Sequence, residues 1–235
     1  MFNIDAGGGF ARLERRLSDM PRQIPYALSL ALTDVAQQVR KAEYDEALRV
    51  FDRPTKWTLN SLRVKPASKS DLTAAVYFRE FAAKGTPANK YLGPQVWGGE
   101  RSLKRAEIAL ASKGNRGFPR GTYLVPGKKM KLDKHGNVPR GTIVRILSDL
   151  QASSDTGQNR NAAKKSGKYF VGTPGGAPLG VYMRKRDRVE PMLIAVKTPK
   201  YSIRLHFGLV AETVTARELM PAFERAARRV RLTAR

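Results

Sequence analysis

Residues 22–51, RQIPYALSLALTDVAQQVRKAEYDEALRVF, carry the clearest structural signal in this chain. Apolar side chains recur there every three or four positions, with Gln, Arg, Lys, Asp and Glu between them. That spacing is typical of a long amphipathic helix whose apolar stripe faces a core. The helix is expected to end at Arg53-Pro54, because proline does not continue a helix. The apolar positions are Ile24, Leu28, Leu32, Val35, Val39 and Ala42.

Shorter elements are predicted on either side of this helix. Residues 10–20 repeat the helical spacing, and Pro21 and Pro25 then interrupt it. A short first helix and a bend are therefore expected before the long helix. After it, residues 59–66 and 72–78 have the composition of two strands around a polar turn, which predicts a β-hairpin.

The middle of the chain, residues 81–168, is rich in Gly and Pro and has little regular periodicity. Two helical segments stand out within it, at 99–112 and 140–150. Residues 153–167 have the Ser, Asn, Gln and Gly composition of a solvated loop or a flexible arm. This middle stretch is therefore expected to be a loop-rich excursion from the main fold.

Strand character returns in the last third of the chain, and an amphipathic helix closes it. Strands are expected at 169–173, 179–183 and 192–198. The closing helix carries arginines in its final turns, where cations suit the helix dipole. Its apolar face is formed by Leu219, Phe223, Ala226, Ala227 and Val230.

This order of elements predicts an α+β fold, in which the long N-terminal helix and the C-terminal helix pack on one antiparallel sheet. A chain of 235 residues can form one elaborated domain of this kind. We expect a single domain over 1–235, with a core of approximately 10–80 and 169–235 and a basic insertion at 81–168.

The charge balance indicates a polyanionic partner. The 44 Lys and Arg against 20 Asp and Glu leave a formal net charge of +24. Two partners fit equally well: DNA phosphates, or an acidic protein surface.

The absence of Cys excludes disulfides and thiolate metal sites and permits assembly in the cytoplasm. No stretch approaches the ~18 apolar residues needed to cross a bilayer, so no membrane contact is expected.

Catalytic patterns are missing from the sequence. His135 and His206 stand far apart and form no metal-binding pair. The acidic residues Asp45, Glu46 and Asp52 would point to different sides of a helix, which favours a solvated face. No phosphate-binding glycine loop or nucleophile elbow has the required order of residues. We therefore expect a protein that is not an enzyme and has no cofactor or metal.

Cations and aromatic residues within and beside the excursion are the candidate contact residues. A cationic groove with aromatic faces can bind single strands, whereas a duplex would use the cations alone. The aromatic residues Tyr91, Trp97 and Tyr123 are expected instead to anchor the long loop onto the sheet. The candidate partner- or DNA-contacting residues are Arg101, Lys104, Arg105, Lys128, Lys129, Lys131, Arg184, Lys185 and Arg186.

Three segments resemble proteins encoded in the structural gene clusters of tailed bacteriophages. They are residues 50–62 (VFDRPTKWTLNSL), 84–88 (KGTPA) and 90–101 (KYLGPQVWGGER). The likeness extends to Pro126-Gly127, to residues 141–144 and to the closing helix, so it covers most of the chain. The sequence is similar to the minor tail protein Z and head–tail joining (tail-completion, neck) group.

This resemblance implies a small α+β protein that forms a homo-oligomeric ring at the neck or tail end of the particle. The partners it implies are other virion proteins, namely the portal or adaptor, the tail terminator or the tail tube. The expected location is the virion, and the host cytoplasm during assembly. The alternative from the charge alone is a non-enzymatic, sequence-independent DNA-binding protein. The long insertion departs from the shorter members of the group.

Overall fold

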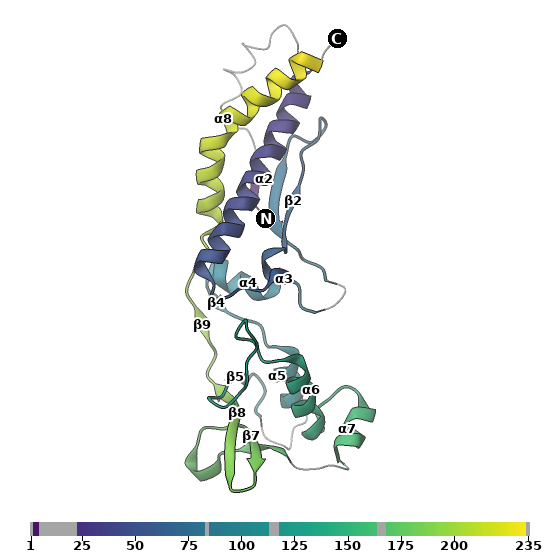
Figure 1. The fold of residues 1–235 in the computed structure, drawn as a ribbon, viewed down its shortest axis with the longest axis vertical. Helices are drawn as coiled ribbons and strands as arrows, with labels where there is room; N and C mark the ends of the chain where they lie inside the picture. The colour runs from purple at the N-terminus through teal and green to yellow at the C-terminus, as the bar shows by residue number, and fades with distance from the viewer. Residues whose placement is uncertain (1, 5–22, 83–84, 113–117, 164–167, 234–235) are drawn as a thin grey trace. The chain divides into compact units, whose positions relative to one another are not determined.

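The computed structural model describes residues 2–4, 23–82, 85–112, 118–163 and 168–233 (Figure 1). Helices and antiparallel strands are mixed, so the predicted α+β class is confirmed. The chain divides into two compact units. The first unit is Met1–Gly98 with Ser202–Arg235, and the second unit is Gly99–Tyr201. Each unit contains its own cluster of buried apolar side chains.

The first unit is built around two long helices, α2 (Ile24–Val50) and α8 (Phe207–Thr233), which lie side by side (Figure 1). Leu28, Leu32, Val35 and Val39 of the predicted stripe are buried, the last three with no solvent exposure. Ile24 and Ala42, the two outer positions of the stripe, are half-buried. The packing of the long N-terminal helix on the C-terminal helix is therefore confirmed. The closing helix begins earlier than its apolar face indicated. It changes direction about halfway, near Pro221, which cannot donate a helical hydrogen bond (Figure 1).

A three-stranded antiparallel sheet with the order β1-β3-β2 completes this unit. Its strands are β1 (Phe2–Ile4), β2 (Leu62–Lys65) and β3 (Ala74–Phe78). The predicted hairpin is β2 with β3, with Val64 opposite Val76. Leu62 and Val76 are buried in the same apolar cluster as the stripe of α2. The predicted helix over 10–20 falls outside the described residues.

The first unit also contains two short helices, which are stabilised by a capping residue and by side-chain contacts and show no apolar repeat in the sequence. Thr55 caps α3 (Lys56–Leu59) by accepting the backbone N–H of Thr58 at 3.2 Å. The Thr58 hydroxyl lies 3.0 Å from the Tyr91 hydroxyl of α4 (Ala88–Trp97). No apolar repeat indicated α4, and Pro94 stands inside it.

One carboxyl group is buried within the first unit. Glu43 lies on α2, in line with Val39 and Ala47, and its side chain has no solvent exposure. Neither of its oxygen atoms has a hydrogen-bond partner among the described residues. Burial raises the pKa of Glu43 to about 8, and the negative charge of Glu46 acts in the same direction. The group is therefore mostly in its neutral acid form at neutral pH.

The second unit contains a four-stranded antiparallel sheet with the order β5-β8-β7-β6. Leu124, Val181 and Leu193 from this sheet share one buried cluster with Ile146 of α6. The strands are β5 (Tyr123–Pro126), β6 (Tyr169–Gly172), β7 (Gly180–Lys185) and β8 (Arg188–Val196). The helices are α5 (Arg105–Ser112), α6 (Arg140–Asp149) and α7 (Thr156–Ala163), with a 3-10 turn at Pro174–Gly176.

The chain enters and leaves the second unit through a pair of very short strands. β4 (Gly99–Glu100) pairs antiparallel with β9 (Lys200–Tyr201), and Gly99 lies directly opposite Tyr201. The two ends of the unit are therefore neighbours.

Several predicted features differ from this structure. Strands 169–173, 179–183 and 192–198 were expected to join the hairpin of residues 59–78 in one sheet, but β8 pairs with β5 instead. The two parts thus have separate sheets, and the unit boundaries lie near residues 98 and 202 rather than 81 and 168.

Two local predictions in the middle stretch also need correction. The loop expected over 153–167 is wrong for Thr156–Ala163, because these residues form α7, and 164–167 lie outside the described residues. Asp155 accepts the backbone N–H groups of Gly157 and Gln158 at its start, at 2.9 and 3.2 Å. The helix expected over 99–112 begins only at Arg105, after β4.

Candidate polyanion-binding surface

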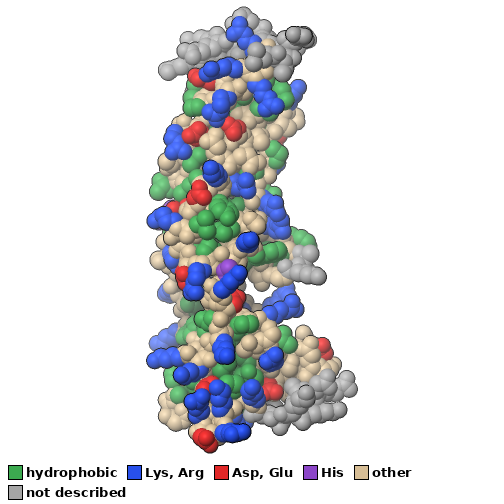
Figure 2. All heavy atoms as spheres, in the orientation of Figure 1, with side chains coloured by type: hydrophobic (Ala, Val, Ile, Leu, Met, Phe, Trp, Pro, Cys, Tyr) green, Lys and Arg blue, Asp and Glu red, His purple; other side chains and the backbone are tan. Residues whose placement is uncertain are grey.

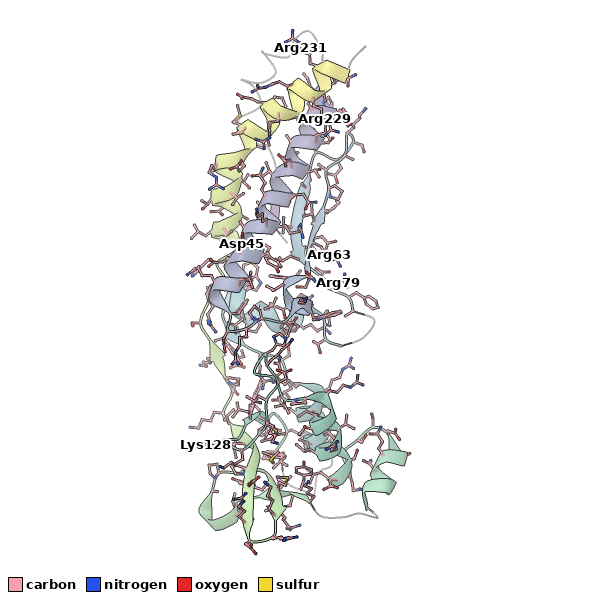
Figure 3. All side chains as sticks on the ribbon, viewed as in Figure 1. Asp45, Arg63, Arg79, Lys128, Arg229 and Arg231 are labelled. Carbon is pink, nitrogen blue, oxygen red and sulfur yellow. The ribbon has the colours of Figure 1, made fainter. Side chains whose placement is uncertain are left out.

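Seven cations of the second unit lie at or beside the turn between β7 and β8 and in the turn that follows β5. We call this set the basic hairpin surface, and all of its members are exposed. Figure 2 shows Lys and Arg side chains crowded over the β7–β8 end of the unit, and Figure 3 places Lys128 beside β8. The surface consists of Lys128, Lys129, Lys131, Arg184, Lys185, Arg186 and Arg188.

The turn after β5 is fixed by backbone and core contacts. The Gly127 N–H donates to the Met192 carbonyl of β8 at 2.8 Å, and the Met130 N–H donates to the Gly127 carbonyl at 2.9 Å. The Met130 side chain is buried in the core of the second unit. Lys128, Lys129 and Lys131 therefore remain on the solvent side while the turn itself is held in place.

The β7–β8 hairpin turns over two residues, because Lys185 lies directly opposite Arg188. Glu190 accepts from Lys185 at 3.0 Å and lies 3.2 Å from the Arg188 guanidinium. The hydrogen bond from Lys185 holds the pKa of Glu190 below its ordinary value, and the charges of Arg188 and Lys129 act in the same direction. Glu190 thus stays ionised and offsets part of the positive charge.

Arg184 and Arg186 extend this surface along the hairpin. The Arg184 guanidinium lies over the Phe170 ring of β6, 4.4 Å from its centroid. Arg186 stands at the turn itself and is exposed. A group of exposed cations on a fixed hairpin can bind phosphates or carboxylates through charge, and it offers no geometry for selecting one base sequence.

Arg101, the first of the predicted contact residues, has a different role. Its guanidinium donates to both oxygens of the buried Glu107, at 2.8 and 2.5 Å, and lies 4.7 Å from the centroid of the Tyr123 ring. Glu107 also accepts the backbone N–H groups of Lys104 and Leu124, at 2.6 and 2.9 Å.

Burial alone would raise the pKa of Glu107, but the hydrogen bonds from Arg101 and the two backbone N–H groups outweigh it and hold that pKa below its ordinary value. The Arg101 guanidinium is therefore paired with a buried carboxylate inside the second unit. Lys104 and Arg105 are exposed around the start of α5.

The three predicted aromatic anchors are placed in three different ways. The Tyr91 hydroxyl meets Thr58, so Tyr91 joins α4 to α3. Tyr123 is buried in the second unit, and its hydroxyl donates to the Arg101 carbonyl at 3.1 Å. Trp97 is 69% exposed, so the expectation that it anchors a loop is wrong. Since Tyr123 and Phe118 are both buried, the excursion offers no stacking platform made from these rings.

Sequence reasoning missed Arg188 as a member of the surface. The sequence signal for it was the run Arg184–Arg188, in which a two-residue turn brings the first and last cations onto paired strands.

Within the described ranges, no cluster of three or more His, Asp or Glu side chains could hold a metal ion. The helices of the same ranges include none with the length and apolar character that a bilayer crossing requires. Comparisons with protein families, with curated proteins and with solved structures give no match to this chain.

Proposed function

We propose that this chain is a non-enzymatic structural protein of a tailed bacteriophage particle, acting at the head–tail junction or tail end during assembly. The basic hairpin surface is the observation that carries the proposal, because it presents a fixed group of cations to a partner. The resemblance of residues 50–62, 84–88 and 90–101 to minor tail and head–tail joining proteins supplies the class of particle. Assembly takes place in the host cytoplasm, and the protein then remains in the virion.

In this proposal the basic hairpin surface docks on an acidic face of a neighbouring virion protein, such as a portal, adaptor, terminator or tube subunit. Charge complementarity of this kind raises the association rate and selects the partner. Copies of the chain form a closed ring by head-to-tail contacts. Protein contacts are favoured over DNA because assembly requires a specific site, and attraction to phosphates alone gives none.

The second candidate function is sequence-independent binding of DNA through the same surface. Exposed lysines and arginines that neutralise phosphates release counterions, so this binding would fall steeply with salt. The cations themselves therefore favour neither partner, and only the consequence of reversing them separates the two.

The test is the triple variant in which Lys128, Lys129 and Lys131 are each changed to Glu. All three are exposed, so the fold of the second unit should be retained. The control carries an equal change of charge on the first unit, with the exposed residues Arg40, Lys41 and Lys90 changed to Glu. Sedimentation of particles measures incorporation, and a salt series measures binding of the free protein to duplex DNA.

We expect the triple variant to be absent from particles and the control to be incorporated, with DNA binding of the free protein equal in both. Weaker duplex binding, with a salt slope that flattens by about 0.9 for each phosphate that is no longer neutralised, would support the second candidate instead. Normal incorporation together with normal DNA binding would contradict both.

A further inference from the structure

The first unit has a positively charged surface of its own, which carries exposed aromatic rings and shares no residue with the basic hairpin surface. It is formed by the outer face of the β2–β3 hairpin, by α3 and by the residues after β3. We call it the cation–aromatic surface and define it as Trp57, Arg63, Tyr77, Arg79 and Phe81.

The pleat of the hairpin separates this surface from the core. Leu62 and Val76 point toward α2 and are buried, so the alternate residues Arg63 and Tyr77 belong to the opposite face. Arg63 and Tyr77 lie directly opposite each other on the paired strands. Arg63 is exposed, and Tyr77 is half-buried.

Arg79, the residue that follows β3, lies on the same face of the hairpin as Tyr77. Its backbone N–H donates to the Ser61 carbonyl at 2.8 Å, which continues the pairing beyond the end of β3. Its guanidinium lies 5.9 Å from the centroid of the Trp57 ring. Figure 3 shows Arg63 and Arg79 next to each other on one side of the hairpin.

Two rings at this surface are open to solvent. Trp57 is 46% exposed although its neighbour Leu59 is buried and fixes α3. Phe81 is 78% exposed, the largest exposure among the large apolar residues of the described chain. Both rings therefore present faces on which a flat ligand can stack.

The arginines of this surface keep their charge available to a ligand. No described carboxylate lies within ion-pairing distance of Arg63 or Arg79. The neighbouring Lys65 differs, because it pairs with Asp71 at 3.0 Å. The surface thus combines available guanidinium groups with flat apolar faces.

We infer that the cation–aromatic surface binds single-stranded nucleic acid. Arg63 and Arg79 would contact phosphates, while unpaired bases stack on Trp57 and Phe81. This combination of cations and stacking faces is what sequence-tolerant recognition of single strands requires. A duplex keeps its bases stacked inside and uses only the cations, and an acidic protein surface gains nothing from ring stacking. The inference does not depend on the proposed function.

The tryptophans allow a direct test, because the chain has two of them, Trp57 and Trp97. The reference protein carries Trp97→Phe, so that its fluorescence reports Trp57 alone. It also carries the Lys128, Lys129 and Lys131 to Glu changes, which weaken binding at the basic hairpin surface. A short oligodeoxythymidine strand is the probe, and we expect it to quench Trp57 fluorescence in a saturable manner.

The variants separate stacking from charge. For these variants the charge-reversed protein keeps Trp97, and binding is followed by the fluorescence anisotropy of a labelled strand. Trp57→Ala should weaken binding of the strand roughly 10-fold, the usual effect of removing one stacking face, and Trp57→Phe should retain most of it. Trp97→Ala is the matched control, since Trp97 is also an exposed tryptophan of the first unit, and it should have no effect. Arg63→Gln and Arg79→Gln should each flatten the salt slope by about 0.7.

Three results would overturn the inference. One is the absence of quenching by the strand. Another is an equal decrease of affinity in the Trp57→Ala and Trp97→Ala proteins. The third is equal competition by a duplex of the same length or by polyglutamate, because either would mean that charge alone governs binding. None of these results bears on particle incorporation, which tests the proposed function.

Discussion

The buried Glu43 should make the stability of the first unit depend on pH in an unusual direction. Its pKa rises from an ordinary value of 4.5 to about 8 on folding, so the folded protein holds a proton that the unfolded chain releases. The stabilising effect of the neutral acid is complete below pH 4.5 and is lost as the pH rises through 8. The free energy of unfolding of this unit should therefore be roughly 3–4 kcal/mol lower at pH 8 than at pH 5.

Urea unfolding followed by tryptophan fluorescence measures this quantity for the first unit alone, because Trp57 and Trp97 both belong to it. Glu43→Gln, which does not titrate, is the variant to compare. We expect the drop between pH 5 and pH 8 in the parent protein to disappear in Glu43→Gln. Glu43→Met should be more stable than the parent at pH 8, because it places no polar group in the core. An equal drop in the parent and in Glu43→Gln would refute the argument.

The remaining predictions concern packing and the polar interior. Leu32→Ala should lower the free energy of unfolding of the first unit by about 2–5 kcal/mol in urea denaturation, while Gln38→Ala should change it by less than about 0.5 kcal/mol. Arg101→Leu should destabilise the second unit by about 3–5 kcal/mol in a thermal or urea melt followed by circular dichroism, because it leaves the buried Glu107 carboxylate without its cation. Gly127→Ala should lower the same stability and disturb the turn that carries Lys128, since an added Cβ would lie 2.5 Å from a carbonyl oxygen of β8; an unchanged melt would contradict the close approach.

Elements with a strong apolar repeat could be predicted from the sequence. The stripe of α2 and the alternation of β2 with β3 both place one face in a core, so the pattern of residues reports the secondary structure. The closing helix was recognised only from its second half, because β-branched residues and a glycine weaken the helical pattern between Phe207 and Leu219.

The choice of strand partners could not be predicted in the same way. The four residues of β5 carry no sign of which strand they pair with, and that pairing assigns β6, β7 and β8 to the second unit. The helix α4 was missed because Pro94 indicated an irregular segment, whereas packing of Leu92 and Val96 stabilises it as a helix.

The contacts within the candidate sites could not be predicted from the sequence either. Charge could be counted along the chain, but the burial of Glu107 could not be inferred from it, so Arg101 was assigned to a partner instead of to the interior. Trp57 was noted only as part of a resemblance. Its position beside Arg79 depends on an antiparallel pairing and on the cap at Thr55, which only the folded chain brings together.

The pairing of Gly99 with Tyr201 brings the two ends of the second unit next to each other, as in a domain inserted into another domain. A segment whose two ends are adjacent can be taken out of a chain, or exchanged for another of different length, by joining the flanking residues with a short turn. The first unit keeps its own apolar core in such a chain, since no residue of the second unit belongs to it. A chain with a different segment between residues 98 and 202 would retain the helix pair and the β2–β3 hairpin as its scaffold.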